Sequence, residues 1–157
     1  MKKRILKRVG VVLVILIGVV FIFAKVKRVT PLSWSHNKIN VPMFSNQAIN
    51  GYDPVAYFTE NKAVKGSEDN MYNWNDADWY FSSAENKNSF IENPDRYAPQ
   101  FGGFCSFAVT KGFTANTEPE AFEVINDKLY LFADQDMRES WMSDPEGNMK
   151  ICTENWK

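Results

Sequence analysis

The first apolar stretch of the chain covers residues 9–24, which include no charge and no strongly polar side chain. As a helix rising about 1.5 Å per residue, this stretch spans roughly 24 Å, slightly less than the ~30 Å hydrocarbon core of a bilayer. Val26 extends the run past Lys25, whose methylene stem can reach toward the lipid head groups. We therefore expect a transmembrane helix over residues 9–26.

The basic residues before this stretch also occur in cleaved signal peptides, whose apolar region is usually about 7–15 residues long and ends at a small-x-small site. Here the run is longer, and residues 21–24 (Phe-Ile-Phe-Ala) provide no such site. An uncleaved signal anchor is the favoured interpretation, and a cleaved signal peptide or a buried core helix are the alternatives.

The charges on either side of the stretch predict its orientation. Five basic residues precede it and three follow it: Lys2, Lys3, Arg4, Lys7 and Arg8 before, and Lys25, Lys27 and Arg28 after. The more basic flank of a membrane helix usually stays in the cytoplasm. A single-pass protein is therefore expected, with its N-terminus cytoplasmic and the remaining chain periplasmic or extracellular.

Residues 29–47 have the composition of a linker. Pro31 and Pro42 interrupt the segment, Ser and Asn are frequent, and no apolar period persists for two helical turns. The only histidine, His36, lies here and is interpreted as a solvated side chain. The predicted organisation is a basic N-terminus with a membrane anchor (1–28), a linker (29–47) and one domain (48–157).

Short apolar runs separated by turn signals fill the domain. Strands are predicted at 55–58, 71–75, 79–81, 122–125 and 128–132, the last two joined by the hairpin turn Asn126-Asp127. Helices are predicted at 83–91, 104–111 and 134–143. Because helices and strands do not alternate regularly, the pattern predicts an α+β fold with a small, mainly antiparallel sheet. No internal repeat is evident.

The net charge of −1 conceals a strong asymmetry. Eight of the 18 basic residues lie in residues 1–28, which contain no acid, so the remaining chain carries ten basic residues against all 19 acids. A domain with this acidic excess repels a phosphate backbone, and nucleic acid is therefore not an expected partner. The basic N-terminus instead suits anionic lipid head groups.

Three ordered segments resemble the YHS domain family in its longer bacterial form. They are residues 50–58 (NGYDPVAYF), residues 79–86 (WYFSSAEN) and residues 90–105 (FIENPDRYAPQFGGFC). The ordered set is far more specific than any single segment. The resemblance extends over residues 48–157 and implies that this region has the fold of the family.

Some relatives in that family are tied to heavy-metal transport and sensing. They carry one cysteine after Asp-Pro-Val and two more in a Phe-Cys-Ser-x-x-Cys helix start, a set suited to Cu(I) or Zn. The same places in this chain hold Ala56, Ser82 and Asn86, none of which is a soft ligand. The resemblance therefore carries over the fold and not the thiolate site.

Cys105 and Cys152 are the only cysteines, and their spacing is not that of a Cys-x-x-Cys motif. As a nucleophile Cys105 would need a base, and the only histidine lies in the predicted linker. A buried structural thiol is the favoured interpretation of Cys105. A disulfide to Cys152 and a copper or zinc site, with a methionine or carboxylate beside Cys105, are the alternatives.

Two other features have both a functional and a structural interpretation. The Gly102-Gly103 pair can bind an anion through backbone N–H groups or simply form a tight turn. Asp53 and Glu85 can act as an acid pair, or Asp53 can cap the turn at Pro54 while Glu85 favours a helix start. The structural interpretation is favoured for both.

The sequence shows no Ser/His/Asp set, phosphate loop or histidine cluster, which argues against hydrolysis and phosphoryl transfer. It predicts a membrane-tethered binding module without catalysis of its own, whose ligand is a small molecule, a metal-bearing partner or another envelope protein. Copper or other heavy-metal handling through Cys105 is the alternative. The candidates for ligand binding are Asp53, Tyr57, Gly102, Gly103 and Cys105.

Overall fold

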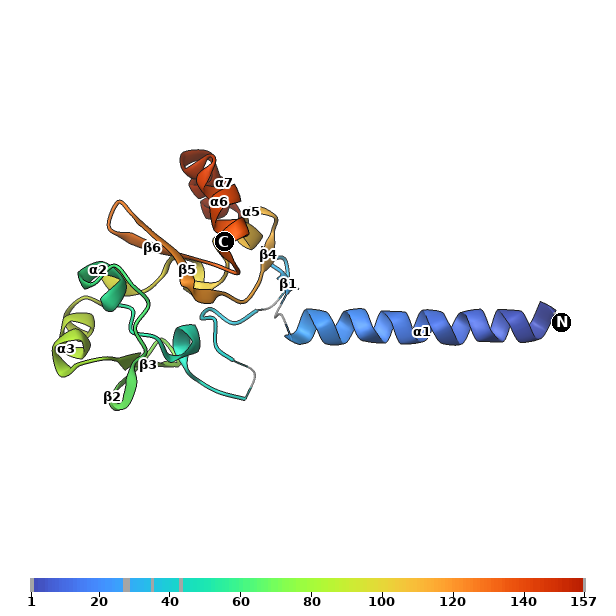
Figure 1. The fold of residues 1–157 in the computed structure, drawn as a ribbon, viewed down its shortest axis with the longest axis horizontal. Coiled ribbons are helices and arrows are strands. Elements are labelled where there is room, and N and C mark those ends of the chain that lie inside the picture. The colour runs from blue at the N-terminus through green and yellow to red at the C-terminus, as the bar shows by residue number, and fades with distance from the viewer. Residues whose placement is uncertain (1, 27–28, 35, 43, 157) are drawn as a thin grey trace.

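Short helices and narrow antiparallel ribbons follow one long N-terminal helix (Figure 1). The computed structural model describes residues 2–26, 29–34, 36–42 and 44–156. The elements in chain order are α1 (Lys2–Val26), β1 (Thr30–Pro31), η1 (Ala48–Gly51), α2 (Ala56–Thr59), β2 (Ser67–Trp74), β3 (Ala77–Phe81), α3 (Ala84–Glu92), α4 (Pro94–Tyr97), η2 (Gln100–Gly103), α5 (Ser106–Thr110), β4 (Phe113–Thr114), β5 (Glu118–Ile125), β6 (Lys128–Phe132), α6 (Gln135–Met142) and α7 (Pro145–Asn155).

Across the described residues, the strands form three two-stranded antiparallel sheets: β1 with β4, β2 with β3, and β5 with β6. The predicted α+β class with short helices and antiparallel pairing is confirmed, although the pairing is divided among separate ribbons. A two-stranded ribbon is marginally stable by itself. The fold therefore depends on packing the ribbons against helices and against one another.

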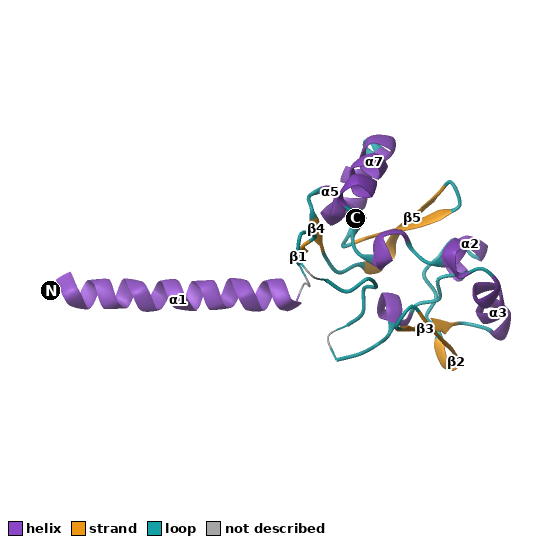
Figure 2. Cartoon of the chain, turned by 180° about the vertical axis from the view of Figure 1, so that it is seen from behind, coloured by secondary structure: helices purple, strands orange, loops and turns teal. Residues whose placement is uncertain are grey.

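Helix α1 extends away from the rest of the chain in both views (Figure 1, Figure 2). Its described side chains between Val9 and Val20 are mainly large apolar groups exposed on all sides, with Val14 at 70 % exposure. Among the residues that the structure describes, no helix is long and apolar enough to span a membrane.

The segment predicted as a linker packs against the domain. Strand β1 pairs with β4, and Ile39 and Asn40 are buried. The Asn40 backbone N–H donates to the Gly102 carbonyl oxygen at 2.8 Å. These contacts join residues far apart in the chain and leave no periodic pattern, which explains why the sequence did not reveal them.

Residues 55–58 were predicted as a strand, and this prediction is wrong because helix α2 begins at Ala56. The Asp53 carboxylate accepts hydrogen bonds from the backbone N–H groups of Val55 at 2.8 Å and Ala56 at 3.3 Å, which turns the chain into the helix. Val55, Ala56 and Tyr57 are all buried. A continuous buried run has no period that distinguishes helix from strand.

The two central hairpins are confirmed. Asn75 and Asp76 connect β2 to β3, and Asn126 and Asp127 connect β5 to β6, all four with positive φ between 52° and 61°. Positive φ at both turn positions matches the right-handed twist of the flanking strands, and Asn and Asp tolerate it.

The helices after the hairpins are also confirmed, with the caps that their sequences predict. The Ser83 hydroxyl accepts from the Asn86 backbone N–H at the start of α3, and the Asp134 carboxylate accepts from the Met137 N–H at the start of α6. Helix α7 was not predicted, although Asp144 caps it. Helix α5 is shorter than the predicted range 104–111.

The domain contains an arrangement of elements that occurs twice, a structural repeat that no similarity along the sequence revealed. Residues 48–97, the first lobe, and residues 100–155, the second lobe, share one order of elements: a left-handed turn, a short helix, a hairpin and two helices. Figure 1 shows the lobes side by side, with α2, α3, β2 and β3 in one and α5, α6, α7, β5 and β6 in the other.

The strand registers of the two hairpins coincide when the first is shifted by 51 residues. The pair Ser67 and Phe81 becomes Glu118 and Phe132, and each hairpin has a register shift directly after this pair. Few side chains are identical at matched positions, which hid the repeat in the sequence. The two hairpins therefore share their strand register, although most of their matched side chains differ.

Each lobe has its own aromatic core with the same ring arrangement. The matched pairs, with distances between ring centroids, are Phe90–Trp79 at 5.1 Å and Phe90–Phe81 at 5.2 Å in the first lobe, and Trp141–Tyr130 at 5.2 Å and Trp141–Phe132 at 5.5 Å in the second. The helix after each hairpin therefore supplies one ring that closes the core of its lobe.

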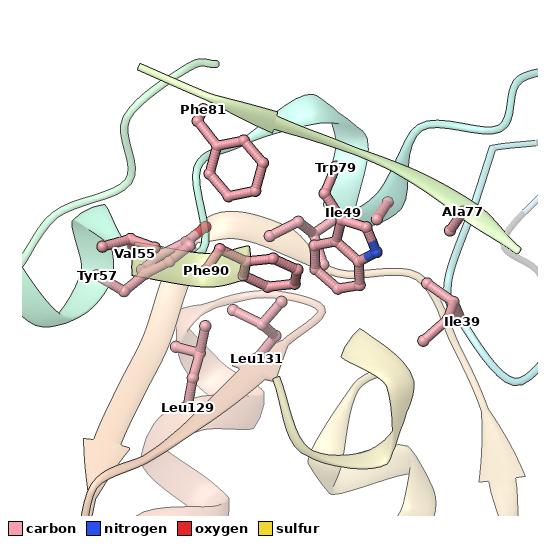
Figure 3. Close-up of a cluster of buried hydrophobic side chains, with 11 residues drawn as sticks. Ile39, Ile49, Val55, Tyr57, Ala77, Trp79, Phe81, Phe90, Leu129 and Leu131 are labelled. Atoms are coloured by element: carbon pink, nitrogen blue, oxygen red, sulfur yellow. The ribbon is translucent and has the colours of Figure 1, made fainter. Parts of the chain in front are cut away.

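Strand β6 joins the two cores because both of its faces are buried. Leu129 and Leu131 belong to the first core, where Figure 3 shows them beneath Phe90. Tyr130 and Phe132 belong to the second core. Since alternate side chains of a strand point to opposite faces, one strand supplies residues to both lobes.

Candidate functional site

The Asp53 carboxylate is fully buried and holds the first lobe together. One oxygen caps α2, as described above, and the other accepts from the Ser82 backbone N–H at 2.8 Å, the Ser82 hydroxyl at 2.7 Å and the Asn86 side-chain amide at 2.7 Å. Both oxygens are therefore engaged within the protein. Glu85 is exposed and is not among these partners; its pKa is lowered by its own backbone N–H and by Ser83.

The three positions compared above with a thiolate set meet at this carboxylate. The Ala56 backbone, the Ser82 backbone and hydroxyl, and the Asn86 amide all donate to Asp53. Residues separated by up to thirty positions in the sequence are thus neighbours in the fold. What they form here is a polar network centred on a carboxylate.

Tyr57 has a structural contact of its own. Its ring is buried, and its hydroxyl donates to the Pro119 carbonyl oxygen of β5 at 3.1 Å. Burial and the nearby Glu120 charge raise the pKa of this phenol far above its usual range. Tyr57 therefore links the first lobe to the second.

The Gly102-Gly103 pair lies where segment 29–47 approaches η2 closely. Both residues have positive φ, 62° and 77°, and a Cβ at Gly102 would come within 1.8 Å of the Lys38 carbonyl oxygen. The Gly103 carbonyl oxygen accepts from the Asn40 side chain at 3.0 Å and from the Thr117 hydroxyl at 3.2 Å. Close backbone packing requires glycine here.

Cys105 takes the place in the second lobe that Asp53 takes in the first. Its sulfur accepts from the Ala133 backbone N–H at 3.3 Å and lies 4.0 Å from the Met137 sulfur. Ala133 and Met137 are the counterparts of Ser82 and Asn86 after the 51-residue shift. Burial raises the pKa of the Cys105 thiol. The backbone N–H groups of Ala108, Ala133 and Phe107 lower it, but burial has the larger effect.

The disulfide between Cys105 and Cys152, one of the alternatives raised by the sequence, is absent. Both thiols are free and buried. The Cys152 thiol donates to the Ser106 carbonyl oxygen at 3.3 Å, while Cys105 faces Met137. Burial raises the pKa of Cys152 to about 11, although Trp141 acts in the opposite direction. Within the described part of the chain, no group of three or more His, Cys, Asp or Glu is placed to hold a metal ion.

A groove of about 810 Å³ is lined by residues of segment 29–47 and of both lobes, and none of the sequence-based candidates except Gly102 lines it. Its walls come from segment 29–47, the β2–β3 turn, the start of η2, the start of β6 and the end of the chain. The aromatic residues in the lining are Trp34, His36, Trp74, Phe101 and Trp156; the charged ones are Lys38, Asp95 and Lys128.

The aromatic rings of the groove pack against one another at one wall. Trp156 lies 5.2 Å from the His36 ring and 5.9 Å from the Phe101 ring, between centroids. His36 also contacts the carbonyl oxygen of Trp34 through Nδ1 at 3.1 Å. The interpretation of His36 as a solvated linker side chain is therefore wrong, because the segment folds back and half-buries the ring.

One feature of the sequence indicated this groove: aromatic residues occur in segments that lack the regular hydrophobic spacing of a helix or strand. Trp34 and Trp156 lie outside the family-like segments, near the two ends of the folded domain, so nothing along the chain indicated that they meet. The volume lies within the range of small-molecule sites, and the lining combines polar and apolar surface.

No family model, curated protein or solved structure matches this chain. Its function is therefore inferred from the geometry of its own residues.

Proposed function

We propose that this chain is a membrane-tethered, extracytoplasmic, YHS-like binding module without catalysis of its own, and that its ligand occupies the aromatic groove. The groove carries the proposal. It combines a volume suited to a small molecule with exposed apolar ring surface, and Trp34 remains 64 % exposed. Exposed aromatic surface in a concavity is the usual feature of a ligand site.

The candidate reactive groups support binding in preference to chemistry. Both oxygens of Asp53 accept hydrogen bonds inside the first lobe, and the Tyr57 hydroxyl is bonded to Pro119. Burial keeps the pKa of Cys105 above its ordinary value, so its reactive thiolate is disfavoured. A turnover assay that detected intrinsic chemistry would contradict this part of the proposal.

The family assignment is supported by the meeting of Ala56, Ser82 and Asn86 around Asp53. Positions that form one site in relatives should lie together in this chain, and these do. In this chain the polar network takes the place of a metal site and stabilises the first lobe.

The membrane anchor is proposed from the uncharged apolar sequence of residues 9–24 and from the exposed side chains of α1, although no described helix meets the length and apolarity of a membrane span. The helix exposes apolar side chains all round over its described central part, and such a surface requires an apolar environment. The greater number of basic residues before the apolar stretch than after it supports a cytoplasmic N-terminus and an extracytoplasmic domain.

The anchor and its orientation can be tested in cells with a Glu139→Cys variant, since Glu139 is exposed on α6. We expect the protein to stay with membranes after alkaline extraction and to react with an impermeant maleimide from the extracytoplasmic side. The unsubstituted chain, whose thiols are buried, is the control. Release into the soluble fraction, or labelling only after cell lysis, would contradict the proposal.

Groove binding can be tested by screening small-molecule fragments with ligand-observed NMR against the full chain in nanodiscs. We expect fragments that bind the wild-type chain and are lost in Trp156→Ala. Ile151→Ala is the matched control, because Ile151 is exposed on the adjoining helix α7 and outside the groove. Fragments that bind both variants equally would place binding elsewhere.

Copper or other heavy-metal handling through Cys105 is the alternative proposal, and the neighbouring Met137 favours it. A thiolate and a thioether are soft ligands that suit Cu(I). With sulfurs 4.0 Å apart, two metal–sulfur bonds of about 2.3 Å would subtend an angle of roughly 120°. The pair therefore fits two positions of a trigonal site.

The test is a Cu(I) and Zn(II) titration of the reduced full chain without oxygen. Stoichiometric binding lost in Cys105→Ser, weakened in Met137→Leu and retained in the control Met142→Leu would establish the alternative. Binding that persists in Cys105→Ser, or no binding at all, would exclude this site.

A further inference from the structure

We propose that the groove recognises a planar ligand that carries an anionic group, such as an aromatic ring system bearing a phosphate, sulfonate or carboxylate. This inference rests on the proposed binding function and specifies the chemical class of the ligand. The arrangement of rings and charges in the lining carries it.

The rings favour a planar ligand. Trp34 and Trp156 come from distant segments and line one groove together with Phe101. Trp34 is largely exposed, whereas Trp156 is held against Phe101 and His36. A flat apolar ligand would cover this ring surface by stacking, and aromatic pairs gain interaction energy beyond the area that they bury.

The charges favour an anion. Lys38 and Lys128 line the groove from different parts of the fold, segment 29–47 and the start of β6. Neither has an ion-pair partner among the described residues. Asp95 is the one carboxylate in the lining as the structure describes it, so the groove is locally basic within a strongly acidic domain.

A basic patch in an acidic domain is informative because long-range charge repels anions from this protein in general. An anion in the groove would lie among lining residues that include Lys38 and Lys128, whose ammonium groups can donate charge-assisted hydrogen bonds. Neutral aromatic ligands would use the rings alone. The combination therefore selects for a planar anion over either a neutral ring or a simple ion.

The probes for the test differ from one another in one feature each. The full chain in nanodiscs of neutral lipid is titrated with 1-naphthyl phosphate, with 1-naphthol, which lacks the anion, and with inorganic phosphate, which lacks the ring. We expect 1-naphthyl phosphate to bind at least about tenfold more tightly than either of the others.

Surface variants then separate charge from ring. In Lys38→Gln/Lys128→Gln we expect 1-naphthyl phosphate to bind about tenfold more weakly while 1-naphthol is unaffected. Lys111→Gln/Lys150→Gln is the control with the same change of net charge outside the groove. Equal binding of 1-naphthyl phosphate and 1-naphthol, or equal losses in the two double variants, would overturn the inference.

The outcomes also distinguish the two proposals. Fragments that are lost in Trp156→Ala, with no preference for the phosphate probe, would leave the binding function standing and remove the anion. Absence of any groove binding would remove both. Repeating the titration in nanodiscs that contain phosphatidylglycerol identifies the source of the anion: competition indicates a membrane lipid, and unchanged binding a soluble ligand.

Discussion

A carboxylate in the first lobe and a thiol in the second occupy the same place in two copies of one backbone arrangement. Asp53 accepts from backbone N–H groups at the start of a short helix and after a hairpin, and the Cys105 sulfur meets the equivalent groups. Next to them lie Asn86 in the first lobe and Met137 in the second.

The backbone N–H groups at this position can therefore face either a carboxylate or a thiol sulfur. The two acceptors differ in how much they contribute to stability. A carboxylate forms several short hydrogen bonds, and its removal leaves buried donors without partners. A thiol is a weak acceptor that behaves mainly as a small apolar group. At this one position the first lobe therefore relies on hydrogen bonds to a carboxylate, and the second lobe relies on the packing of a thiol.

The largest expected effect tests what the lobes share. Phe90 and Trp141 are fully buried and close the matched aromatic cores. Phe90→Ala and Trp141→Ala should each lower the free energy of unfolding by about 3–5 kcal/mol, because each leaves a large cavity. Urea unfolding of the full chain measures this, with exposed Ile91→Ala as control. A loss confined to one variant would mean that the cores are not equivalent.

The second largest expected effect tests the difference between the Asp53 carboxylate of the first lobe and the Cys105 thiol of the second. Asp53→Ala should lower the free energy of unfolding by about 3 kcal/mol or more, since it leaves the buried N–H groups of Val55 and Ala56 and partly buried donors of Ser82 and Asn86 unpaired. Cys105→Ala should cost roughly 1–2 kcal/mol, because it removes a small packed group. The same urea experiment compares them, with exposed Glu68→Ala as control. Equal losses would refute the distinction between polar bonding and packing.

The helix caps should contribute equally. Ser83→Ala and Asp134→Ala each remove the side chain that accepts a hydrogen bond from the backbone N–H of the third residue of α3 or α6, Asn86 or Met137. Each variant should lose about 1 kcal/mol of stability. Replacement of Ser83 by Asp, the residue at the matched cap, should restore the wild-type stability, and failure to do so would show that the caps differ in context.

The smallest effect is a pH dependence that belongs to the second lobe. Burial raises the pKa of Cys152 from 9 to about 11, so the folded state favours the neutral thiol. Its contribution to stability is complete below pH 9 and is lost as the pH rises toward 11, because the unfolded chain releases its proton first. The Cys152→Ser variant should show a smaller decline between pH 9 and 10. An identical decline would assign the effect to other groups.

Local signals in the sequence predicted the elements that are stabilised locally. Asn126-Asp127 predicts a hairpin and Asp134 a helix start, and both hold because the responsible contacts lie within a few residues. Contacts between distant residues left no such signal. Asn40 bonds to Gly103 across 63 positions, and Trp156 reaches His36 from the far end of the chain.

Of the residues that the sequence singled out as site candidates, only Gly102 lines the groove. The family-like segments contain residues that matter for the fold: Asp53, Tyr57 and the Gly102-Gly103 pair all make buried contacts or close backbone packing. The groove instead depends on side chains from segment 29–47 and from the end of the chain. The groove forms only when these distant segments fold together, and neither a hydrophobic period nor a sequence motif predicts that contact.

Because strand β6 contributes to the cores of both lobes, neither lobe is expected to fold without the other. A repeat whose units contact each other only at their surfaces can lose one unit and keep the other, as in solenoid proteins. Here Leu129 and Leu131 serve one core while Tyr130 and Phe132 serve the other. Opening either lobe exposes the strand that the other lobe needs, so the two copies form a single cooperative folding unit.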